Sequence, residues 1–451
     1  MGDVLRTAAA FATASLLGMA LVAASSPRTV RPVSLVLVSI DGLRPGDVLE
    51  ADRYGLAVPN LRRLAAEGAF ASGVAGVAPT ITFPSHVTQV TGVSPARHGI
   101  LANEPFDAPG EDERVSCWSA PDIRVPTLWD AAADRGFVTS SVDWPVTAGA
   151  RITYNIPQYW RAHGAQERKL QRLLVTPGLF AEAEKALGPY PPSHLWNVDQ
   201  DERRAAFNIY LIATRKPRLH LAYLAGLDEA SHASGPGSPA AAAALTRIDA
   251  MVGRIRAAAE ANGPAIVAVT SDHGFRRTRR ELHLNAALRE AGLIHLGRDG
   301  GIDSWRAFAW GMGGSVSILL RDPGDDAARA TVSRLLAELE ADPRAGITRV
   351  LRGGEVAASG GFEGAAFVVG LRGEHRFGDD LYGPTMRDGE PWGTHGNLPD
   401  DRAMDAAFFA AGPGIPAGLR LGRIDMRDIA PTLAARLGLI LPAAEGRDVL
   451  R

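Results

Sequence analysis

Short apolar runs alternate along the chain with segments that have helical periodicity. The run from Val33 to Ile40 (V-S-L-V-L-V-S-I) is apolar almost throughout, which predicts a buried parallel strand. The segment from Asn60 to Gly68 follows with an N-cap residue, helical spacing and a terminal glycine, as expected of a helix. A strand, a helix and a loop in this order begin an α/β unit.

The same alternation continues toward the C-terminus, so the chain as a whole is predicted to be an α/β protein. Helices are predicted at Thr127–Gly136, Asp199–Thr214, Ala240–Asn262 and Asp428–Gly438, and strands at Phe137–Asp143, Leu219–Gly226, Ala265–Thr270 and Ala406–Ala411.

The pattern is looser between about residues 294 and 390. Glycine-rich pieces there surround a predicted helix at Asp326–Ala341 and β-like runs at Ser315–Leu320 and Ala365–Leu371. This change of pattern predicts a small subdomain inserted into the main domain.

Composition narrows the class of protein. The chain has 451 residues, of which 46% are hydrophobic and 22% charged, enough for one large core or two moderate ones. The formal net charge is −2, and the longest basic stretch is the short cluster from Arg276 to Arg280. We therefore exclude long nucleic acid as a partner, because the chain offers no basic field to hold it.

The first 25 residues are typical of a secretory signal peptide. An arginine at position 6 precedes an Ala-rich apolar stretch, with small residues near Ala24 that suit cleavage. The alternative is an uncleaved membrane anchor, because the stretch approaches the roughly 20 residues that a spanning helix needs. The chain has one cysteine, Cys117, which rules out an internal disulfide framework. We expect an exported protein, periplasmic or secreted, in which the membrane matters only if this segment is retained.

Three predicted strands are followed by acidic residues. Asp41 follows the first strand, Asp228 the strand at Leu219–Gly226, and Asp272 the strand at Ala265–Thr270. In open α/β sheets, ligands bind outside the carboxyl ends of the strands. The pattern therefore places a site at this edge of the sheet.

Histidines accompany these acids at spacings that suit a metal. Asp228 and His232 are four residues apart, His273 follows Asp272 directly, and His395 lies in G-T-H-G. Mixed Asp/His ligation suits Zn²⁺, with Mn²⁺ or a related ion as an alternative. Each pair alone is more often an ordinary turn, so the prediction depends on their joint occurrence. The remaining histidines considered are interpreted as structural or surface residues: His86, His98, His220 and His283.

The segment from Pro79 to Asn103 has the character of a nucleophile loop. A hydroxyl residue precedes a Pro turn, and Val87 to Thr91 can start a helix whose N-terminus faces that hydroxyl. Unpaired N–H groups at a helix N-terminus favour a bound phosphate. Turn chemistry alone also explains such a Ser/Thr-Pro sequence, so the loop indicates a nucleophile only in combination with the other motifs of the chain.

Taken together, these motifs resemble the alkaline phosphatase superfamily and, within it, the nucleotide pyrophosphatase/phosphodiesterase family. The run T-x-T-F-P-S-H-x-x-x-x-T-G-x-x-P-x-x-H-G-I carries the resemblance. It implies an alkaline-phosphatase-like sandwich over residues 30–451, with a mostly parallel central sheet flanked by helices. It also implies that Thr82 is the nucleophile and that Asn103 helps to hold the phosphoryl oxygen. One zinc would be held by Asp41, Thr82, Asp272 and His273, and the other by Asp228, His232 and His395.

The resemblance implies hydrolysis of phosphodiester or pyrophosphate bonds through a phosphothreonine intermediate, with nucleotide-type small molecules as substrates. Ser85 stands where the family often has Asn, and Trp144-Pro145-Val146-Thr147 stands for its W-P-G-S segment, so the substrate stays open. Alternatives are a phosphomonoesterase or phosphonate hydrolase, a glycerophosphodiester or lipid-headgroup phosphodiesterase, and a non-catalytic binding protein. A sulfatase is excluded, because Cys117 lies in S-C-W and not in the C/S-x-P-x-R context that activation of a sulfatase needs. Aromatic residues that would either stack a base, line a headgroup pocket or belong to the core are Trp144, Tyr154, Tyr159 and Trp160. Phe83 would be either a wall of the pocket or a buried packing residue.

Overall fold

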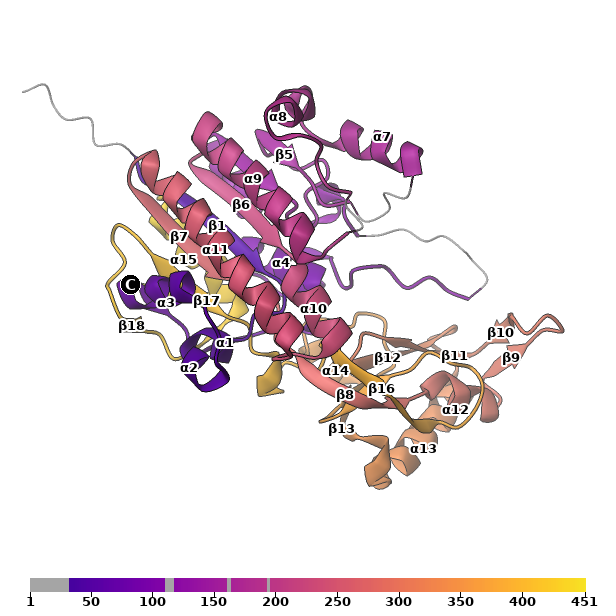
Figure 1. Cartoon of the computed structure of the whole chain (residues 1–451). Helices are drawn as coiled ribbons and strands as arrows, with labels where there is room; N and C mark the ends of the chain where they lie inside the picture. The colour runs from indigo at the N-terminus through magenta and orange to yellow at the C-terminus, as the bar shows by residue number, and fades with distance from the viewer. Residues whose placement is uncertain (1–31, 110–116, 160–163, 193–194) are drawn as a thin grey trace, which may run out of the picture. The chain divides into compact units, whose positions relative to one another are not determined.

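Eight strands among the described residues form one large sheet, in the order β18-β2-β17-β7-β1-β6-β4-β5 (Figure 1). The computed structural model describes residues 32–109, 117–159, 164–192 and 195–451, and the side chains from residue 168 on in helix α7. The predicted signal peptide and Trp160 lie outside these residues. The strands are β1 (Ser34–Ile40), β2 (Ala69–Phe70), β4 (Thr139–Val142), β5 (Tyr154–Ile156), β6 (Leu219–Leu224), β7 (Ala265–Thr270), β17 (Phe408–Ala411) and β18 (Leu419–Arg420).

The centre of this sheet is parallel. Strand β1 pairs in parallel with β6 on one side and β7 on the other, with Leu35 opposite Leu219 and Ser34 opposite Ala265. Strands β4 and β5 continue the parallel part, whereas β17 runs antiparallel to β7. The carboxyl ends of β6, β1 and β7 therefore lie side by side at one edge.

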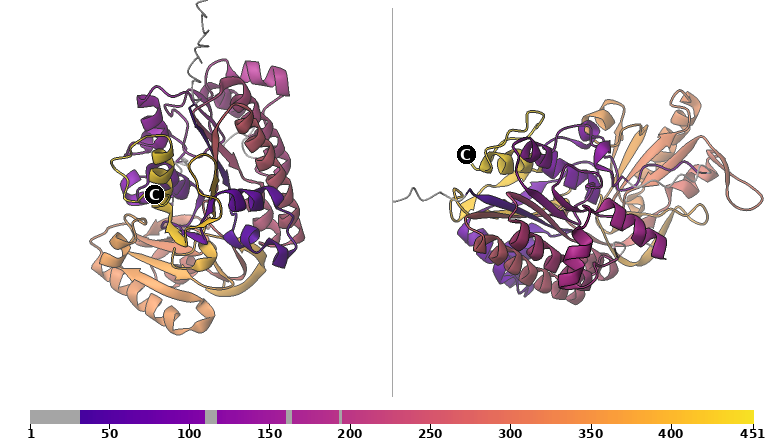
Figure 2. Two further views of the ribbon diagram at one scale, coloured as in Figure 1. Left: turned by 90° about the vertical axis from the view of Figure 1, so that its left-hand side faces the viewer. Right: turned by 90° about the horizontal axis from the view of Figure 1, so that it is seen from above.

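Helices cover both faces of the sheet (Figure 2). Alternate residues of β1 face opposite cores: Leu35 and Leu37 belong to one, Val36 and Val38 to the other. Helices α4 (Thr82–Thr91), α6 (Leu128–Asp134) and α15 (Ile429–Arg436) pack in the first core, and α3 (Pro59–Glu67), α9 (Val198–Arg215) and α11 (Pro239–Ala261) in the second. This arrangement confirms the predicted α/β sandwich.

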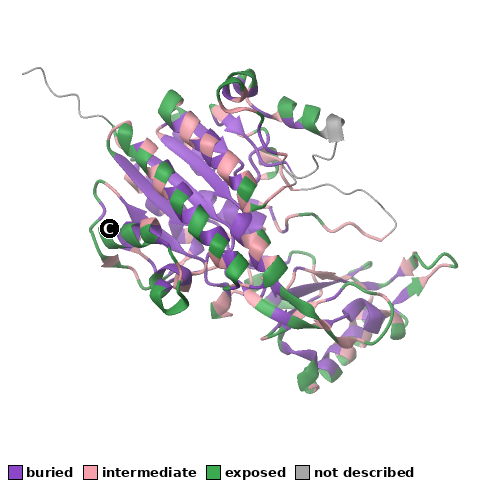
Figure 3. Ribbon diagram, viewed as in Figure 1, coloured by how far each residue is buried: buried purple, intermediate pink, exposed green. Residues whose placement is uncertain are grey.

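Burial on both faces explains the continuous apolar runs in the sequence. Every residue of β6 and β7 is buried, whereas the helices alternate between buried and exposed positions (Figure 3). A strand that is covered on both faces has no polar side, so its sequence does not alternate.

Smaller sheets lie between residues 276 and 394. The strands β11 (Ala307–Gly311), β12 (Ser315–Leu320), β14 (Phe367–Leu371) and β13 (Ile347–Arg352) form one antiparallel sheet. A second sheet joins β15 (His375–Phe377), β8 (Arg276–Leu282) and β16 (Met386–Thr394), and β9 (Ile294–Leu296) pairs with β10 (Ile302–Trp305). With α12 (Leu284–Glu290) and α13 (Asp326–Ala341) they share a hydrophobic core. The inserted subdomain at about 294–390 stays a prediction, and pairing of β8 with β16 shows that these sheets begin earlier in the chain.

Two element boundaries differ from prediction in ways that matter for function. Helix α4 begins at Thr82 rather than at Val87, because Ile81 is extended and Pro84 fits the first turn. Strand β6 ends at Leu224, and α10 (Gly226–Ser234) begins two residues later, so Asp228 and His232 lie on a helix.

Other short elements are α1 (Pro45–Leu49), α2 (Ala51–Tyr54), β3 (Gly73–Ala75), α5 (Pro95–His98), α7 (Gly164–Leu174), α8 (Leu179–Leu187), α14 (Gly354–Ala358) and β19 (Arg423–Asp425). Within the described ranges, no helix combines the length and the apolar character needed to cross a membrane.

Candidate active site

Three carboxylates meet at the carboxyl edge of the parallel strands. Asp41 follows β1 directly, Asp272 is the second residue after β7, and Asp228 lies in the first turn of α10 after β6. Because β1 lies between β6 and β7, the three side chains converge although they are far apart in the sequence.

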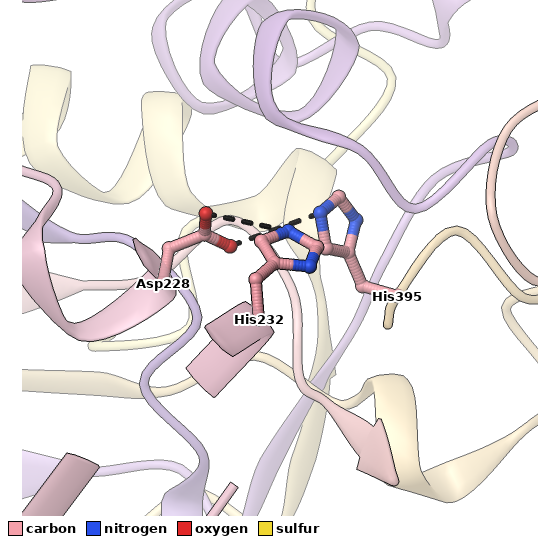
Figure 4. A group of neighbouring side chains, drawn as sticks. All are labelled: Asp228, His232 and His395. Carbon is pink, nitrogen blue, oxygen red and sulfur yellow. Dashed lines mark ion pairs between the residues drawn. The ribbon is translucent and has the colours of Figure 1, made fainter. Parts of the chain in front are cut away.

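The first group of side chains comprises Asp228, His232 and His395 (Figure 4). The Nε2 atom of His232 lies 3.4 Å from Asp228 Oδ2, and Nε2 of His395 lies 3.7 Å from Asp228 Oδ1. His232 follows Asp228 by one helical turn, which places both on the same face of α10. His395 follows β16 and so reaches the large sheet's edge from one of the small sheets.

The second group comprises Asp41, Asp272 and His273, and all three are buried. The Nε2 atom of His273 lies 3.3 Å from Asp41 Oδ1 and 3.2 Å from Asp272 Oδ2. Asp228 also has a carboxylate oxygen within 4.8 Å of ligand atoms of Asp41 and His273. Asp228 therefore lies between the two groups.

The three histidines present the same nitrogen to the carboxylates. Each has its Nδ1 atom beside a backbone carbonyl: His232 with Gly393, His273 with Gly274 and His395 with Thr80, at 2.7, 3.1 and 3.2 Å. A carbonyl only accepts, so Nδ1 carries the hydrogen and Nε2 keeps its lone pair. A lone pair that faces a carboxylate oxygen is repelled by it unless a cation lies between them, which is the usual arrangement in metal sites.

Buried polar atoms at this edge fit the same interpretation. Asp41 Oδ1, Asp228 Oδ1, Asp272 Oδ2 and His273 Nε2 have no hydrogen-bond partner among the residues that the structure describes. Such atoms are costly to bury unless something satisfies them. Divalent cations would satisfy all four, so the donor set fits bound metal.

Charge at the site points the same way. Burial raises the pKa of the Asp272 carboxyl to about 6, and burial with the nearby Asp272 raises the pKa of Asp41 well above its usual value. Burial, with Asp41 next in size, also raises the pKa of Asp228. Burial lowers the pKa of His273, and burial with the neighbouring His273 and His232 lowers that of His395. Negative charge is therefore disfavoured here in the absence of a cation, and the imidazoles of His273 and His395 are neutral, as metal ligands must be.

Thr82 is buried at the first position of α4. Its carbonyl accepts from Nδ1 of His86 at 2.8 Å, and the carbonyl of Thr80, two residues earlier, contacts His395. The Phe83 N–H donates to Asn103 Oδ1 at 2.8 Å. This bond fixes the Asn103 side chain and leaves its amide hydrogens available, whereas the Phe83 N–H is already occupied.

His86, which was interpreted as a structural or surface residue, contacts the second ligand group through Asp272. His86 is fully buried, its Nδ1 atom lies 3.7 Å from Asp272 Oδ2, and its Nε2 atom contacts the Ser39 hydroxyl at 2.8 Å. Tyr223, which the sequence analysis also omitted, donates from its hydroxyl to Asp41 Oδ2. The spacing of four residues between Thr82 and His86, one helical turn, could have indicated that His86 lies near the site. Only the strand register, which pairs Ser39 with Tyr223, brings the tyrosine beside Asp41.

The other three histidines have structural partners. His98 contacts the Thr88 hydroxyl and accepts from the Ile100 N–H, and it joins α5 to α4. His220 lies between the Ser140 hydroxyl and Asn208. His283 precedes α12 and contacts Glu281.

Of the aromatic residues with two possible roles, Trp144, Tyr159 and Phe83 are core residues. Trp144 is fully buried, and its ring and that of His86 pack in a T-shaped arrangement. Tyr159 is buried against Trp118, and Phe83 is buried with Val87, Ile100 and Val146. Tyr154 is partly buried under the Arg215 guanidinium. A base cannot stack on Trp144 or Tyr159 in this structure, because other side chains already cover both rings.

Two arginines near the nucleophile loop are engaged elsewhere. Arg44 forms an ion pair with Asp47 at 2.5 Å, and Arg97 pairs with Glu445 at 3.1 Å. Neither guanidinium is therefore free to bind a phosphoryl group unless its present pair is broken.

This α/β fold, with Asp and His side chains gathered at the carboxyl edge of its parallel strands, is of the alkaline phosphatase type. Residues 35–355 match the family described as type I phosphodiesterase / nucleotide pyrophosphatase. The match covers more than half of the chain, so the protein belongs to this family.

Curated relatives agree over part of their length. An uncharacterized pyrophosphatase/phosphodiesterase of Schizosaccharomyces pombe is 29% identical over 234 residues, which cover 49% of this chain and 40% of the relative. Human bis(5'-adenosyl)-triphosphatase ENPP4 is 25% identical over 259 residues, which cover 56% of this chain and 50% of that protein. The matched region thus spans half or less of these relatives.

Solved structures share the fold. An inactive variant of murine ectonucleotide pyrophosphatase/phosphodiesterase 5 in complex with AMP has a TM-score of 0.67 at 18% identity, and the match covers 93% of this chain and 99% of that one. The human form of the same protein has a TM-score of 0.66 at 18% identity, with coverage of 92% and 99%.

Proposed function

We propose that this protein hydrolyses phosphodiester or pyrophosphate bonds of small, nucleotide-type substrates, with two divalent metal ions and Thr82 as the nucleophile. The observation that carries the proposal is the orientation of three histidines, whose Nε2 lone pairs face carboxylates at distances of 3.2 to 3.7 Å. Membership of a family of phosphodiesterases and pyrophosphatases supplies the reaction class.

The ligands divide into two sets. Asp41, Asp272 and His273 would hold one ion together with Thr82, and Asp228, His232 and His395 would hold the other. Oxygen and nitrogen donors without thiolate fit Zn²⁺ best, and Mn²⁺ is the alternative. Bound ions of this kind supply Lewis acidity, which makes the Thr82 hydroxyl a nucleophile at neutral pH and stabilises the departing oxygen.

The chain's own groups then perform a two-step displacement. Thr82 Oγ1 gives up its hydroxyl proton to solvent and forms a bond to phosphorus while the bond from phosphorus to the leaving oxygen breaks. That oxygen departs with the electron pair and takes a proton from water. Water next cleaves the phosphothreonine and restores the hydroxyl. The Asn103 amide donates to a non-bridging oxygen, in an orientation that its bond from the Phe83 N–H maintains.

Diesters fit this site better than monoesters. A monoester brings an additional anionic oxygen, which a monoesterase meets with a cation. Arg44 and Arg97 are both held in ion pairs, and Asn103 is neutral. A phosphomonoesterase, a phosphonate hydrolase and a headgroup phosphodiesterase remain the alternative functions, because each would use the same ligand groups.

Export through the N-terminal segment, to the periplasm or beyond, is part of the proposal and is supported by the sequence of residues 1–25.

Substitution of Thr82 tests the proposal directly. We expect zinc-loaded protein to hydrolyse an aryl phosphodiester faster than the matched monoester, Thr82→Ala to lose turnover, and Thr82→Ser to retain part of it. Acid quenching during turnover should trap phosphate on Thr82, detected by mass spectrometry. Thr88→Ala, another buried threonine of α4, is the matched control. Undiminished turnover in Thr82→Ala would refute the nucleophile, and zinc binding without turnover of any diester would favour a binding protein.

A further inference from the structure

A hollow of about 370 Å³ opens beside the first metal-ligand group. It is lined by His232 and His395 of that group and by Asn103, Glu104, Trp310 and Met312, among others. The volume lies within the range of small-molecule sites, which is about 300 to 1,000 Å³. The hollow touches the Asp228 group through its two histidines and touches none of Asp41, Asp272 or His273.

We propose that this hollow is the leaving-group subsite and that it selects leaving groups with a flat apolar face and no negative charge. The proposal rests on the proposed function, because an in-line displacement sends the leaving oxygen away from Thr82 and toward the other ligand group. That group is the one whose two histidines line the hollow.

The charge of the lining carries the selectivity. Glu104 is exposed at the rim, and the lining residues that the structure describes include no lysine or arginine. A pyrophosphate or another phosphorylated leaving group brings anionic oxygens that such sites usually meet with Arg or Lys. Here those oxygens would instead meet a carboxylate, which repels them. An uncharged aryl group, or a cation, encounters no such repulsion.

The apolar wall gives the preference for a flat group. Trp310 is partly exposed at the end of β11, and Met312 is buried next to it. An indole face stacks on aromatic rings and attracts cations. Trp310 itself rests on Phe106, with ring centroids 5.7 Å apart, and Phe106 packs also against Trp305 at 5.9 Å. The wall is thus supported from behind by an aromatic cluster.

The wall is also fixed relative to the metal ligands. The Gly314 N–H donates to the His395 carbonyl at 2.8 Å. At Gly313, where φ is +76°, a Cβ atom would lie 2.3 Å from the same carbonyl oxygen, so only glycine permits this approach. Phe106 lies three residues after Asn103, so the aromatic cluster holds the Asn103 loop as well. Trp310, Asn103 and His395 therefore keep one arrangement.

Two substrates that deliver the same thymidylyl group to Thr82 test the proposal. The p-nitrophenyl ester of thymidine 5'-monophosphate releases p-nitrophenol, which carries no charge other than that on its departing oxygen, and thymidine 5'-triphosphate releases pyrophosphate, which carries further anionic oxygens. The readout is the ratio of kcat/KM for the ester to that for the triphosphate, measured on zinc-loaded full-length protein. Ratios between variants cancel the different intrinsic reactivity of the two leaving groups.

We expect Glu104→Gln to raise kcat/KM for the triphosphate about fivefold, the effect of removing one unit charge about 4 Å away in water, with little change for the ester. Glu104→Lys should raise it further. Glu338→Lys, an equal charge change at an exposed position of α13, is the matched control and should leave the ratio unchanged.

Trp310→Ala should lower kcat/KM for the ester about tenfold, the size of one aromatic stacking contact, while Trp310→Phe retains most of it. Circular dichroism of each variant checks that the fold persists. If both substrates are hydrolysed and the ratio of their kcat/KM values is unchanged in the Glu104 and Trp310 variants, this inference is wrong and the proposed function still stands. Failure of the wild-type protein to hydrolyse either substrate would overturn the proposed function instead.

Discussion

The imidazole rings of His273 and His395 lie stacked, with centroids 3.6 Å apart and planes 10° from parallel. His273 follows β7 of the large sheet, and His395 follows β16 of a small one. Burial lowers the pKa of both, so both rings are neutral and can approach face to face. The stack joins the two ligand groups into one centre and requires the small sheet to dock correctly.

Metal content gives the first prediction. Zinc-loaded protein should bind two equivalents, and chelation should abolish turnover until Zn²⁺ is returned. His232→Ala should lose one equivalent, whereas Asp228→Ala should weaken both, because Asp228 lies between the groups. Elemental analysis after dialysis against limiting zinc measures the ratio of bound zinc to protein.

His295→Ala provides the control for metal content, because His295 is an exposed histidine on β9, away from the ligand groups. It should retain two equivalents. A wild-type protein without bound metal, or an equal loss in His295→Ala, would contradict the assignment.

A buried carboxylate behind the site gives the next prediction. Asp201 on α9 accepts from the backbone N–H groups of Gly226 at 2.6 Å and Ala225 at 3.2 Å, and it pairs with buried Arg204 at 3.2 Å. These bonds fix the start of α10, which carries Asp228 and His232. Asp201→Ala should lower the free energy of unfolding by about 1 to 3 kcal/mol, because two buried N–H groups lose their acceptor, while Arg204 keeps its second buried partner, Asp143, at 2.7 Å. It should also weaken zinc binding.

Asp199→Ala separates this effect from general damage to α9. Asp199 pairs with Arg247 at 2.7 Å on the surface, with both side chains substantially exposed. Its loss should cost less than about 1 kcal/mol. Chemical denaturation with and without zinc measures both variants, and Asp201→Asn, which keeps an acceptor oxygen, should lie between them. Equal stability and equal zinc affinity in all three would show that Asp201 does not position α10.

Buried His220 predicts a pH dependence of stability. Burial lowers the pKa of its imidazole from 6.5 to about 3. Between pH 6.5 and about pH 3 the imidazole is protonated in the unfolded chain and neutral in the folded one. This contribution to stability is therefore present above pH 6.5 and is lost as pH falls toward 3. The slope for one such group approaches about 1.4 kcal/mol per pH unit.

Substitution isolates this contribution. His220→Gln should show a shallower loss of unfolding free energy between pH 6.5 and pH 5 than the wild-type protein, although it is less stable at pH 7, because its contacts with Ser140 and Asn208 are weakened. His295→Gln, with an exposed ring, should keep the wild-type slope. An unchanged slope in His220→Gln would mean that the imidazole is protonated in the folded protein.

Much of the architecture followed from local pattern. The runs at Ser34–Ile40 and Ala265–Thr270 are apolar on both faces, which determines a covered parallel strand wherever it lies in the sheet. Helix α13 at Asp326–Ala341 has the predicted bounds, because its cap and periodicity are encoded within the segment. The start of α4 was missed, since Thr82 and Phe83 have low intrinsic helix propensity and tertiary packing decides their conformation.

The sequence by itself determined which residues end the strands, and hence that Asp41, Asp228 and Asp272 would share one edge of a sheet. Tertiary structure alone decided the strand order that places β1 between β6 and β7, and the docking of β16 that brings His395 to His273. It also decided that Trp144 and Tyr159 are closed to substrate and that Trp310 is open. The physical reason is range: strand and helix patterns are set by neighbouring residues, whereas these contacts join segments that only the packed core brings together.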